Sequence, residues 1–200
     1  IPKFPDEKML HNDMPLLWGS ALYSKLNHTV RKNPNSSEDK SKIHYWEAPQ
    51  MVDKPFVLAI QDFHDDYSMT WSHNALIEYL YGYTYSSIYV DNELKILPKK
   101  ISYLNKNGNE IPSGFFFQEL AENISAVIAT PLGTLSKFNR LGKQSGFDQY
   151  NIMMLRMGCC HKNDKNANKP DFFQYCVTEN SKETWAEGLS VFHNPNALHP

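Results

Sequence analysis

Acidic and histidine side chains gather directly after a short apolar run, residues 56–60. Asp62, His64 and Asp65 follow this run at once, and His73 comes next along the chain. Ligands in α/β proteins usually bind where sheet strands end, so these side chains could hold a metal or a phosphate-bearing ligand. The alternative is turn chemistry, in which the acids cap turns or are solvated and the histidine bonds to the backbone.

A second candidate site is the segment Ser-Lys-Phe-Asn-Arg-Leu-Gly-Lys, which holds three cations within seven residues. Lys137, Arg140 and Lys143 could contact phosphates, with Asn139 and an aromatic ring between them, which predicts contact with nucleic acid. The same spacing also suits an amphipathic surface helix that packs its apolar residues on the core. Lys25, on an earlier predicted helix, is a further candidate for nucleic-acid contact.

The three cysteines raise the question of zinc. Cys159 and Cys160 are adjacent and followed by His161, and Cys176 comes fifteen residues later. Thiolates and imidazoles are preferred zinc ligands, but neighbouring cysteines lack the spacer of structural zinc sites. We therefore assign no metal to these residues. An odd number of cysteines also argues against a disulfide framework and suits a reducing compartment.

The predicted elements place these candidates in a mixed α/β fold. Continuous apolar runs predict strands at residues 56–60, 125–129 and 152–155 that are buried on both faces of one sheet. Helical spacing of apolar residues predicts helices at residues 16–30, after an irregular start, and at residues 72–81. The predicted apolar faces are Leu17, Ala21, Leu22 and Leu26 in the first helix, and Ala75, Leu76, Tyr79 and Leu80 in the second, which Gly82 ends. These helices would flank the sheet.

Composition limits the class of protein. A chain of 200 residues, 41% of them hydrophobic, can bury one sizeable core, so we expect a single domain over residues 1–200. The net charge of -2 argues against a generally basic surface for nucleic acid, although local basic patches remain compatible with it. No apolar run is long enough to span a membrane, and we expect a cytoplasmic protein. The start at Ile1 suggests the C-terminal portion of a longer protein.

Several segments together carry a family resemblance. They are Ser-Ala-Leu-Tyr-Ser-Lys-Leu at residues 20–26, Lys-Pro-Phe-Val-Leu-Ala-Ile at 54–60, Ala-Leu to Tyr-Gly at 75–82, Asn-Ile-Ser-Ala-Val-Ile at 123–128 and Phe-His-Asn-Pro-Asn-Ala-Leu-His-Pro at 192–200. In this order they resemble the C-terminal part of uncharacterised bacterial proteins whose upstream part resembles the PD-(D/E)xK restriction-endonuclease-like core.

The resemblance implies a restriction-endonuclease-like fold that lacks its N-terminal strands. The helix at 16–30 would be the second helix of that fold, and residues 56–60 the strand after it. Two-metal hydrolysis of a phosphodiester needs carboxylates held rigidly on neighbouring strands, with a lysine beside them. Glu93 and Lys95 supply an acid-x-lysine, but in polar, turn-like surroundings, and we attribute this match to chance. The catalytic residues are therefore unknown, and Mg²⁺ would bind upstream, in the full-length protein.

Two classes of function follow from this resemblance. In the first, the chain is the C-terminal portion of a metal-dependent nuclease that acts on DNA. In the second, it is a non-catalytic structural or interaction module of the same fold. An aspartate strand and an acid-x-lysine strand in the upstream sequence would separate the two.

Overall fold

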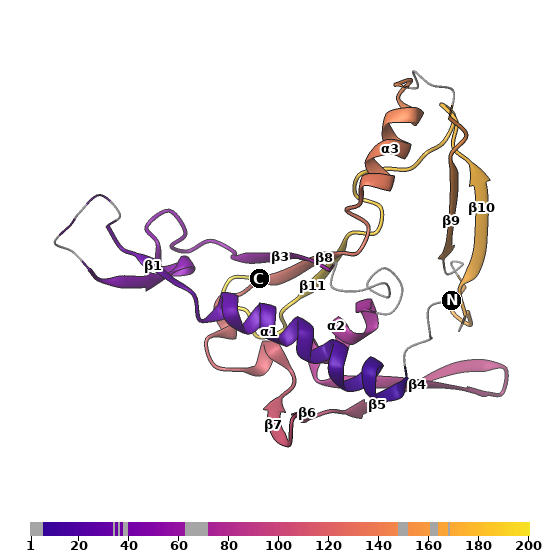
Figure 1. Cartoon of the computed structure of the whole chain (residues 1–200). Helices are drawn as coiled ribbons and strands as arrows, with labels where there is room; N and C mark the ends of the chain where they lie inside the picture. The colour runs from indigo at the N-terminus through magenta and orange to yellow at the C-terminus, as the bar shows by residue number, and fades with distance from the viewer. Residues whose placement is uncertain are drawn as a thin grey trace. The chain divides into compact units, whose positions relative to one another are not determined.

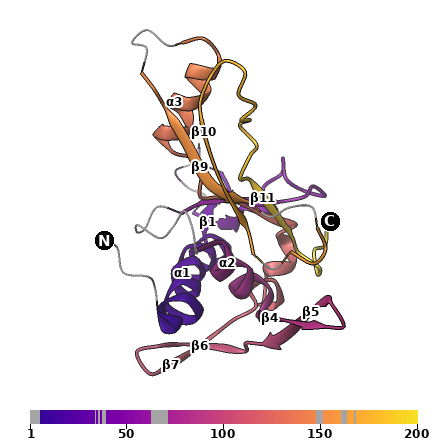
Figure 2. The same ribbon diagram turned by 90° about the vertical axis from the view of Figure 1, so that its right-hand side faces the viewer.

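The computed structural model describes residues 6–33, 35, 37, 40–62, 72–147, 152–160, 164–167 and 169–200 (Figures 1 and 2). These residues form a mixed α/β protein with several small sheets. The chain divides into two compact units. The first unit comprises residues 1–84, 100–131 and 190–200, and the second comprises residues 85–99 and 132–189.

A three-stranded mixed sheet lies in the first unit (Figure 1). Its central strand, β8 (Ala126–Thr130), pairs in parallel with β3 (Val57–Gln61) and antiparallel with β11 (Ser190–His193). The predicted strands at 56–60 and 125–129 are therefore confirmed, and they belong to one sheet.

Burial differs between these strands because only β8 has a neighbour on both sides. Val127 in β8 is fully buried, as predicted. Along β3 the side chains alternate, with Leu58 buried and Val57 exposed. The prediction that residues 56–60 are buried on both faces is thus wrong, because β3 is an edge strand whose second face is not covered.

Helix α1 (Met14–Leu26) begins before the predicted 16–30 and ends earlier, and a π-helical segment, η1 (Met9–Asp13), leads directly into it. Its buried face is Met14, Trp18, Leu22 and Leu26, spaced four residues apart. Of the predicted face, Leu22 and Leu26 are buried as expected, whereas Leu17 and Ala21 are exposed. The large ring of Trp18 decides the orientation of the helix, because its Nε1 donates a hydrogen bond to the buried Ser72 carbonyl at 2.9 Å.

Helix α2 (Ser72–Tyr81) matches its predicted bounds, and its inner face is buried as expected. It packs on α1, and both contribute to one core with the sheet. The segment that follows the β6–β7 hairpin adds two buried rings to this core, Phe115 and Phe116. The remaining elements of this unit are β1 (Thr29–Arg31), β2 (Lys42–His44), η2 (Tyr45–Glu47), β6 (Tyr103–Lys106), β7 (Asn109–Pro112), η3 (Phe115–Phe117) and η4 (Ala121–Asn123).

The second unit contains helix α3 (Leu135–Gln144) and an antiparallel pair, β9 (Leu155–Cys160) and β10 (Asp171–Cys176). It also contains most of a second strand pair, β4 (Tyr83–Val90) and β5 (Glu93–Lys100). Residues 83–84 of β4 and residue 100 of β5 belong to the first unit. The prediction that residues 152–155 join the sheet of the first unit is wrong. Leu155 starts β9, which pairs only with β10 and exposes Leu155 itself. A partner strand close in sequence is easier to reach than a distant sheet, because closing a short loop costs less entropy.

Candidate functional site

The predicted acid and histidine cluster is described only in part, because His64 and Asp65 lie outside the described residues. Asp62 directly follows β3 and is buried. His73 lies in the first turn of α2, where its ring is 5.3 Å from the ring of Phe192. Burial lowers the pKa of His73, because the charged imidazolium loses hydration. His73 is therefore a neutral packing residue at neutral pH.

The cations of the predicted basic segment have partners within the second unit. Lys137 is only 4% exposed, and its Nζ donates to the carbonyls of Trp185 at 3.0 Å and Glu187 at 2.5 Å. Lys143 Nζ donates to the Ile152 carbonyl at 2.6 Å. These bonds hold α3 to the segments on either side of β9 and β10. The sequence showed the charges, but it could not show that the partners are main-chain carbonyls.

Arg140 belongs to a buried ion-pair network. It donates from Nε and Nη2 to the two oxygens of Glu183, at 2.7 and 2.8 Å. Arg156 Nε lies 3.6 Å from the same carboxylate and Arg156 Nη2 pairs with Glu187. Burial alone would raise the pKa of Glu183, but the hydrogen bond from Arg140 and the nearby cations outweigh burial and hold it below its usual value. Glu183 is thus ionised and central to this network.

The roles of the basic residues in contacting nucleic acid stay predictions. Asn139 is exposed on α3, and Lys25 is exposed on α1, in the other unit. Glu93 and Lys95 lie on β5 as an exposed pair, with Lys95 Nζ 2.9 Å from Glu93 Oε2. Both side chains are more than half exposed to solvent.

The hairpin register separates the cysteines. Cys160 is opposite Asp171 at one end of the β9–β10 pair, while Cys176 is opposite Leu155 at the other end. A rise of about 3.3 Å per residue puts roughly 17 Å between the two ends, too far for ligands of one zinc ion. His161 lies outside the described residues. Among the residues that the structure describes, no three histidine, cysteine or acidic side chains are grouped to hold a metal ion.

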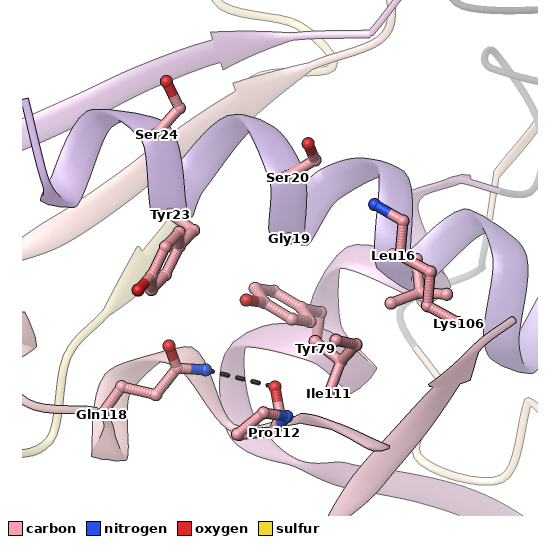
Figure 3. Close-up of a pocket in the computed structure, with 10 residues that line it drawn as sticks. All are labelled: Leu16, Gly19, Ser20, Tyr23, Ser24, Tyr79, Lys106, Ile111, Pro112 and Gln118. Carbon is pink, nitrogen blue, oxygen red and sulfur yellow. Dashed lines mark hydrogen bonds between the residues drawn. The ribbon is translucent and has the colours of Figure 1, made fainter. Parts of the chain in front are cut away.

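The strongest candidate site is a groove of about 600 Å³ beside α1 in the first unit (Figure 3). Tyr23, Tyr79 and Gln118 point into the space between α1 and the chain around Pro112. The other residues along it come from α1 and from the β6–β7 hairpin. The complete lining is Leu16, Gly19, Ser20, Tyr23, Ser24, Tyr79, Lys106, Ile111, Pro112 and Gln118.

Gly19 makes this groove possible. A Cβ atom on Gly19 would lie 2.7 Å from ring atoms Cε2 and Cζ of Tyr79, which is too close for any side chain. The missing side chain lets the Tyr79 ring rest against α1, where the ring forms the inner wall of the groove. A glycine inside a predicted helix signals such a close approach, and this signal could have drawn attention to the site.

The Gln118 side chain holds the wall around Pro112, because its Nε2 donates to the Pro112 carbonyl at 3.3 Å (Figure 3). Burial raises the pKa of the Tyr79 hydroxyl, and the Gln118 side chain opposes that effect only in part. The phenol therefore stays neutral at physiological pH, as both a donor and an acceptor.

The lining offers hydrogen-bonding groups and one positive charge. Hydroxyls and an amide are accompanied by one ammonium group, that of Lys106, and the described lining includes no carboxylate or imidazole. Tyr23 remains largely exposed at the groove's edge.

Comparison of the chain with protein-family models, with curated proteins and with solved structures finds no match. Within the described part of the chain, no helix has the length and apolar character needed to cross a membrane.

Proposed function

We propose that this chain contacts DNA on behalf of a PD-(D/E)xK-like, Mg²⁺-dependent nuclease whose catalytic carboxylates lie outside these 200 residues. The observation that carries the proposal is the lining of the groove beside α1, which offers hydrogen-bond donors and a cation but no carboxylate. Serine, tyrosine, glutamine and lysine side chains are typical contacts to the sugar–phosphate backbone. An acidic lining would repel that backbone.

The position of the cations adds to this proposal. Lys106 lines the groove from the hairpin side. Lys25 is exposed and directly follows Ser24, the last lining residue on α1. Lys106 in the lining and Lys25, next to the lining residue Ser24 in sequence, could each neutralise a phosphate of a strand bound in the groove. A phosphate contact of this kind releases condensed counterions and makes binding depend on salt.

A second candidate is a non-catalytic interaction module of the same fold. It is favoured by a specific observation, the internal partners of Lys137 and Arg140, which occupy side chains that a DNA-binding surface would otherwise offer. In this alternative the charges of α3 serve only to hold the second unit together.

The proposal is tested by titrating the full-length protein with a labelled DNA duplex at several salt concentrations. Lys25→Ala and Lys106→Ala should each weaken binding and reduce the slope of log K against log salt by about 1, because each removes one phosphate contact. Lys165→Ala, an exposed lysine in the second unit, is the matched control and should bind as the unaltered protein does.

Cleavage assays separate the two candidates. With Mg²⁺ the full-length protein should cut DNA, whereas the 200 residues alone should not, because the metal-binding carboxylates are supplied from elsewhere. A full-length protein that neither binds nor cuts DNA would support the interaction module. Cleavage by the 200 residues that disappears in Glu93→Gln would instead make Glu93 and Lys95 catalytic.

A further inference from the structure

Three consecutive phenylalanines have very different environments. Phe115 and Phe116 are 0% and 1% exposed in the core of the first unit, but Phe117 is 59% exposed. An exposed phenylalanine loses the stabilisation that burying such a ring provides. The exposed ring is informative because it lies beside a surface hollow in the same unit.

This surface hollow has a volume of about 430 Å³, and we call it the aromatic hollow. Four aromatic side chains line it, together with the ammonium group of Lys100 and the hydroxyls of two serines. These lining residues are Tyr81, Tyr83, Tyr103, Phe117, Lys100, Ser102 and Ser113. Tyr103 is as exposed as Phe117, at 58%, so two large rings are open to solvent at one site.

Two glycines provide a part of the lining that carries no side chain. Gly82 and Gly114 have φ values of +69° and +78°, which side-chain-bearing residues rarely adopt. A Cβ on Gly82 would lie 3.2 Å from the Gly114 Cα and 3.2 Å from the Ile101 carbonyl oxygen. The two backbones therefore cross in close contact, and both glycines are buried at the base of the hollow.

Hydrogen bonds hold this crossing in place. Gly114 N donates to the Tyr79 carbonyl at 2.9 Å, and Ile101 N donates to the Gly82 carbonyl at 2.8 Å. A Cβ on Gly114 would be 3.3 Å from Phe117 Cδ2, so the exposed ring of Phe117 rests directly beside this glycine. The ring is thus positioned before any ligand binds.

The wall formed by Tyr81 is fixed as well. Its hydroxyl donates to the His193 carbonyl at 3.0 Å, and its ring meets the buried Phe116 edge to face, with centroids 5.3 Å apart. One wall is therefore rigid, while Tyr103 and Phe117 remain available to a ligand. A preformed site loses less entropy when a ligand binds.

We propose that the aromatic hollow binds an unpaired base of single-stranded DNA, with Phe117 or Tyr103 stacked on the base and Lys100 on the adjacent phosphate. Aromatic side chains stack on any base, and a cation beside them pairs with the strand. The hollow has no carboxylate in its lining, which suits an anionic ligand. A base inside a duplex is already stacked on its neighbours and cannot enter.

This inference rests on the proposed function for the choice of DNA and adds that the strand is unpaired at this point. Pro112 lines both the aromatic hollow and the groove beside α1, so the two sites adjoin. A strand held by its backbone in the groove would bring a neighbouring base within reach of the hollow.

The test measures how tightly the full-length protein binds a labelled 12-nucleotide single strand of mixed sequence and the duplex of the same sequence. Divalent metal is left out so that the DNA is not cleaved. Phe117→Ala and Tyr103→Ala should each weaken single-strand binding by about 5- to 100-fold, from the usual range for one stacked base, and leave duplex binding unchanged. Phe117→Tyr and Tyr103→Phe keep a ring and should retain tight binding. Phe172→Ala removes an equally exposed ring from the second unit and is the control.

Each outcome decides a separate point, provided that the variants melt at the same temperature as the unaltered protein. Duplex binding with no effect of Phe117→Ala or Tyr103→Ala overturns this inference and leaves the proposed function standing. Binding of neither DNA form removes both. Tight binding of a neutral oligosaccharide that Lys100→Ala does not alter would also overturn the inference, because the hollow would then recognise a sugar face without a phosphate.

Discussion

The two units of this protein are stabilised in different ways. In the first unit the buried set is mainly apolar, with Met14, Leu22, Leu76 and Val127 at its centre. In the second unit the buried residues among those described are two apolar and three charged, Leu141, Val177, Lys137, Arg156 and Glu183. The first unit is held mainly by removal of apolar surface from water, and the second depends on correctly paired charges.

This difference predicts how each unit fails. Apolar burial contributes in proportion to the area removed from water and depends little on pH or salt. A buried charge contributes only while its partner is in place, because an unpaired buried charge is costly. Single substitutions that remove an apolar ring should therefore damage the first unit, and those that remove one charge should damage the second.

The largest effect is expected from the phenylalanine run of the first unit. Phe116→Ala should lower the free energy of unfolding by about 3 to 5 kcal/mol, because it leaves a cavity in a fully buried site. Phe117→Ala should change it by less than about 0.5 kcal/mol, as for other exposed positions. Urea unfolding followed by tyrosine and tryptophan fluorescence measures both. Equal losses for the two variants would show that Phe117 is a core residue.

A smaller effect of different origin is expected from Glu183→Gln. The substitution keeps the shape of the side chain but leaves Arg140 without a charged partner, and its cost should be about 3 kcal/mol. Hydrogen exchange should show lost protection in α3, β9 and β10, with α1 and α2 unchanged. Glu179→Gln, at an exposed position of the same unit, is the control. Loss of protection in both units would contradict their separate stabilisation.

Acid should lower the stability of the two units in different pH ranges. The loss in the first unit should be the smallest of the effects predicted here. The lowered pKa of His73 means that its contribution is present above its ordinary value of 6.5 and is lost as the pH falls below it. The lowered pKa of Glu183 means that its contribution is present above its ordinary value of 4.5 and is lost at lower pH. Stability of the first unit should therefore start to decline near pH 6.5, and that of the second only below pH 4.5.

The histidine variant separates these two ranges. His73→Phe should abolish the decline of the first unit between pH 6.5 and the lowered pKa, because no imidazole remains to be protonated. The decline of the second unit should persist in this variant. Hydrogen exchange of each unit across this pH range provides the measurement, and a decline of the second unit that begins near pH 6.5 would refute the assignment to Glu183.

Several elements could be predicted because their signals are local. The spacing of Ala75, Leu76, Tyr79 and Leu80 predicted both the bounds and the buried face of α2, and Gly82 predicted its end. The apolar runs around Leu58 and Val127 predicted two strands of one sheet. Short-range periodicity reports the backbone conformation and one buried face, and these are properties of neighbouring residues.

The candidate sites depended on partners that are distant in sequence. Lys137 and Arg140 formed a basic segment in the sequence, but their partners lie 43 to 50 residues later. The sequence shows Gly19 only as a glycine within a predicted helix, and the structure places the Tyr79 ring against it. Residue types thus predicted which side chains can bind ligands or form ion pairs, but not which side chains contact each other.

The sequence by itself determined the α/β class, helix α2 and the strand character of β3 and β8, because these properties depend on the pattern of consecutive residues. Only the tertiary structure decided that Phe116 is buried while Phe117 is exposed and that the charges of α3 have partners within the second unit. It also decided that β9 pairs with β10 and not with the three-stranded sheet. The physical reason is that burial and ion pairing depend on which surfaces meet across long stretches of chain. Periodicity within one segment carries no information about that.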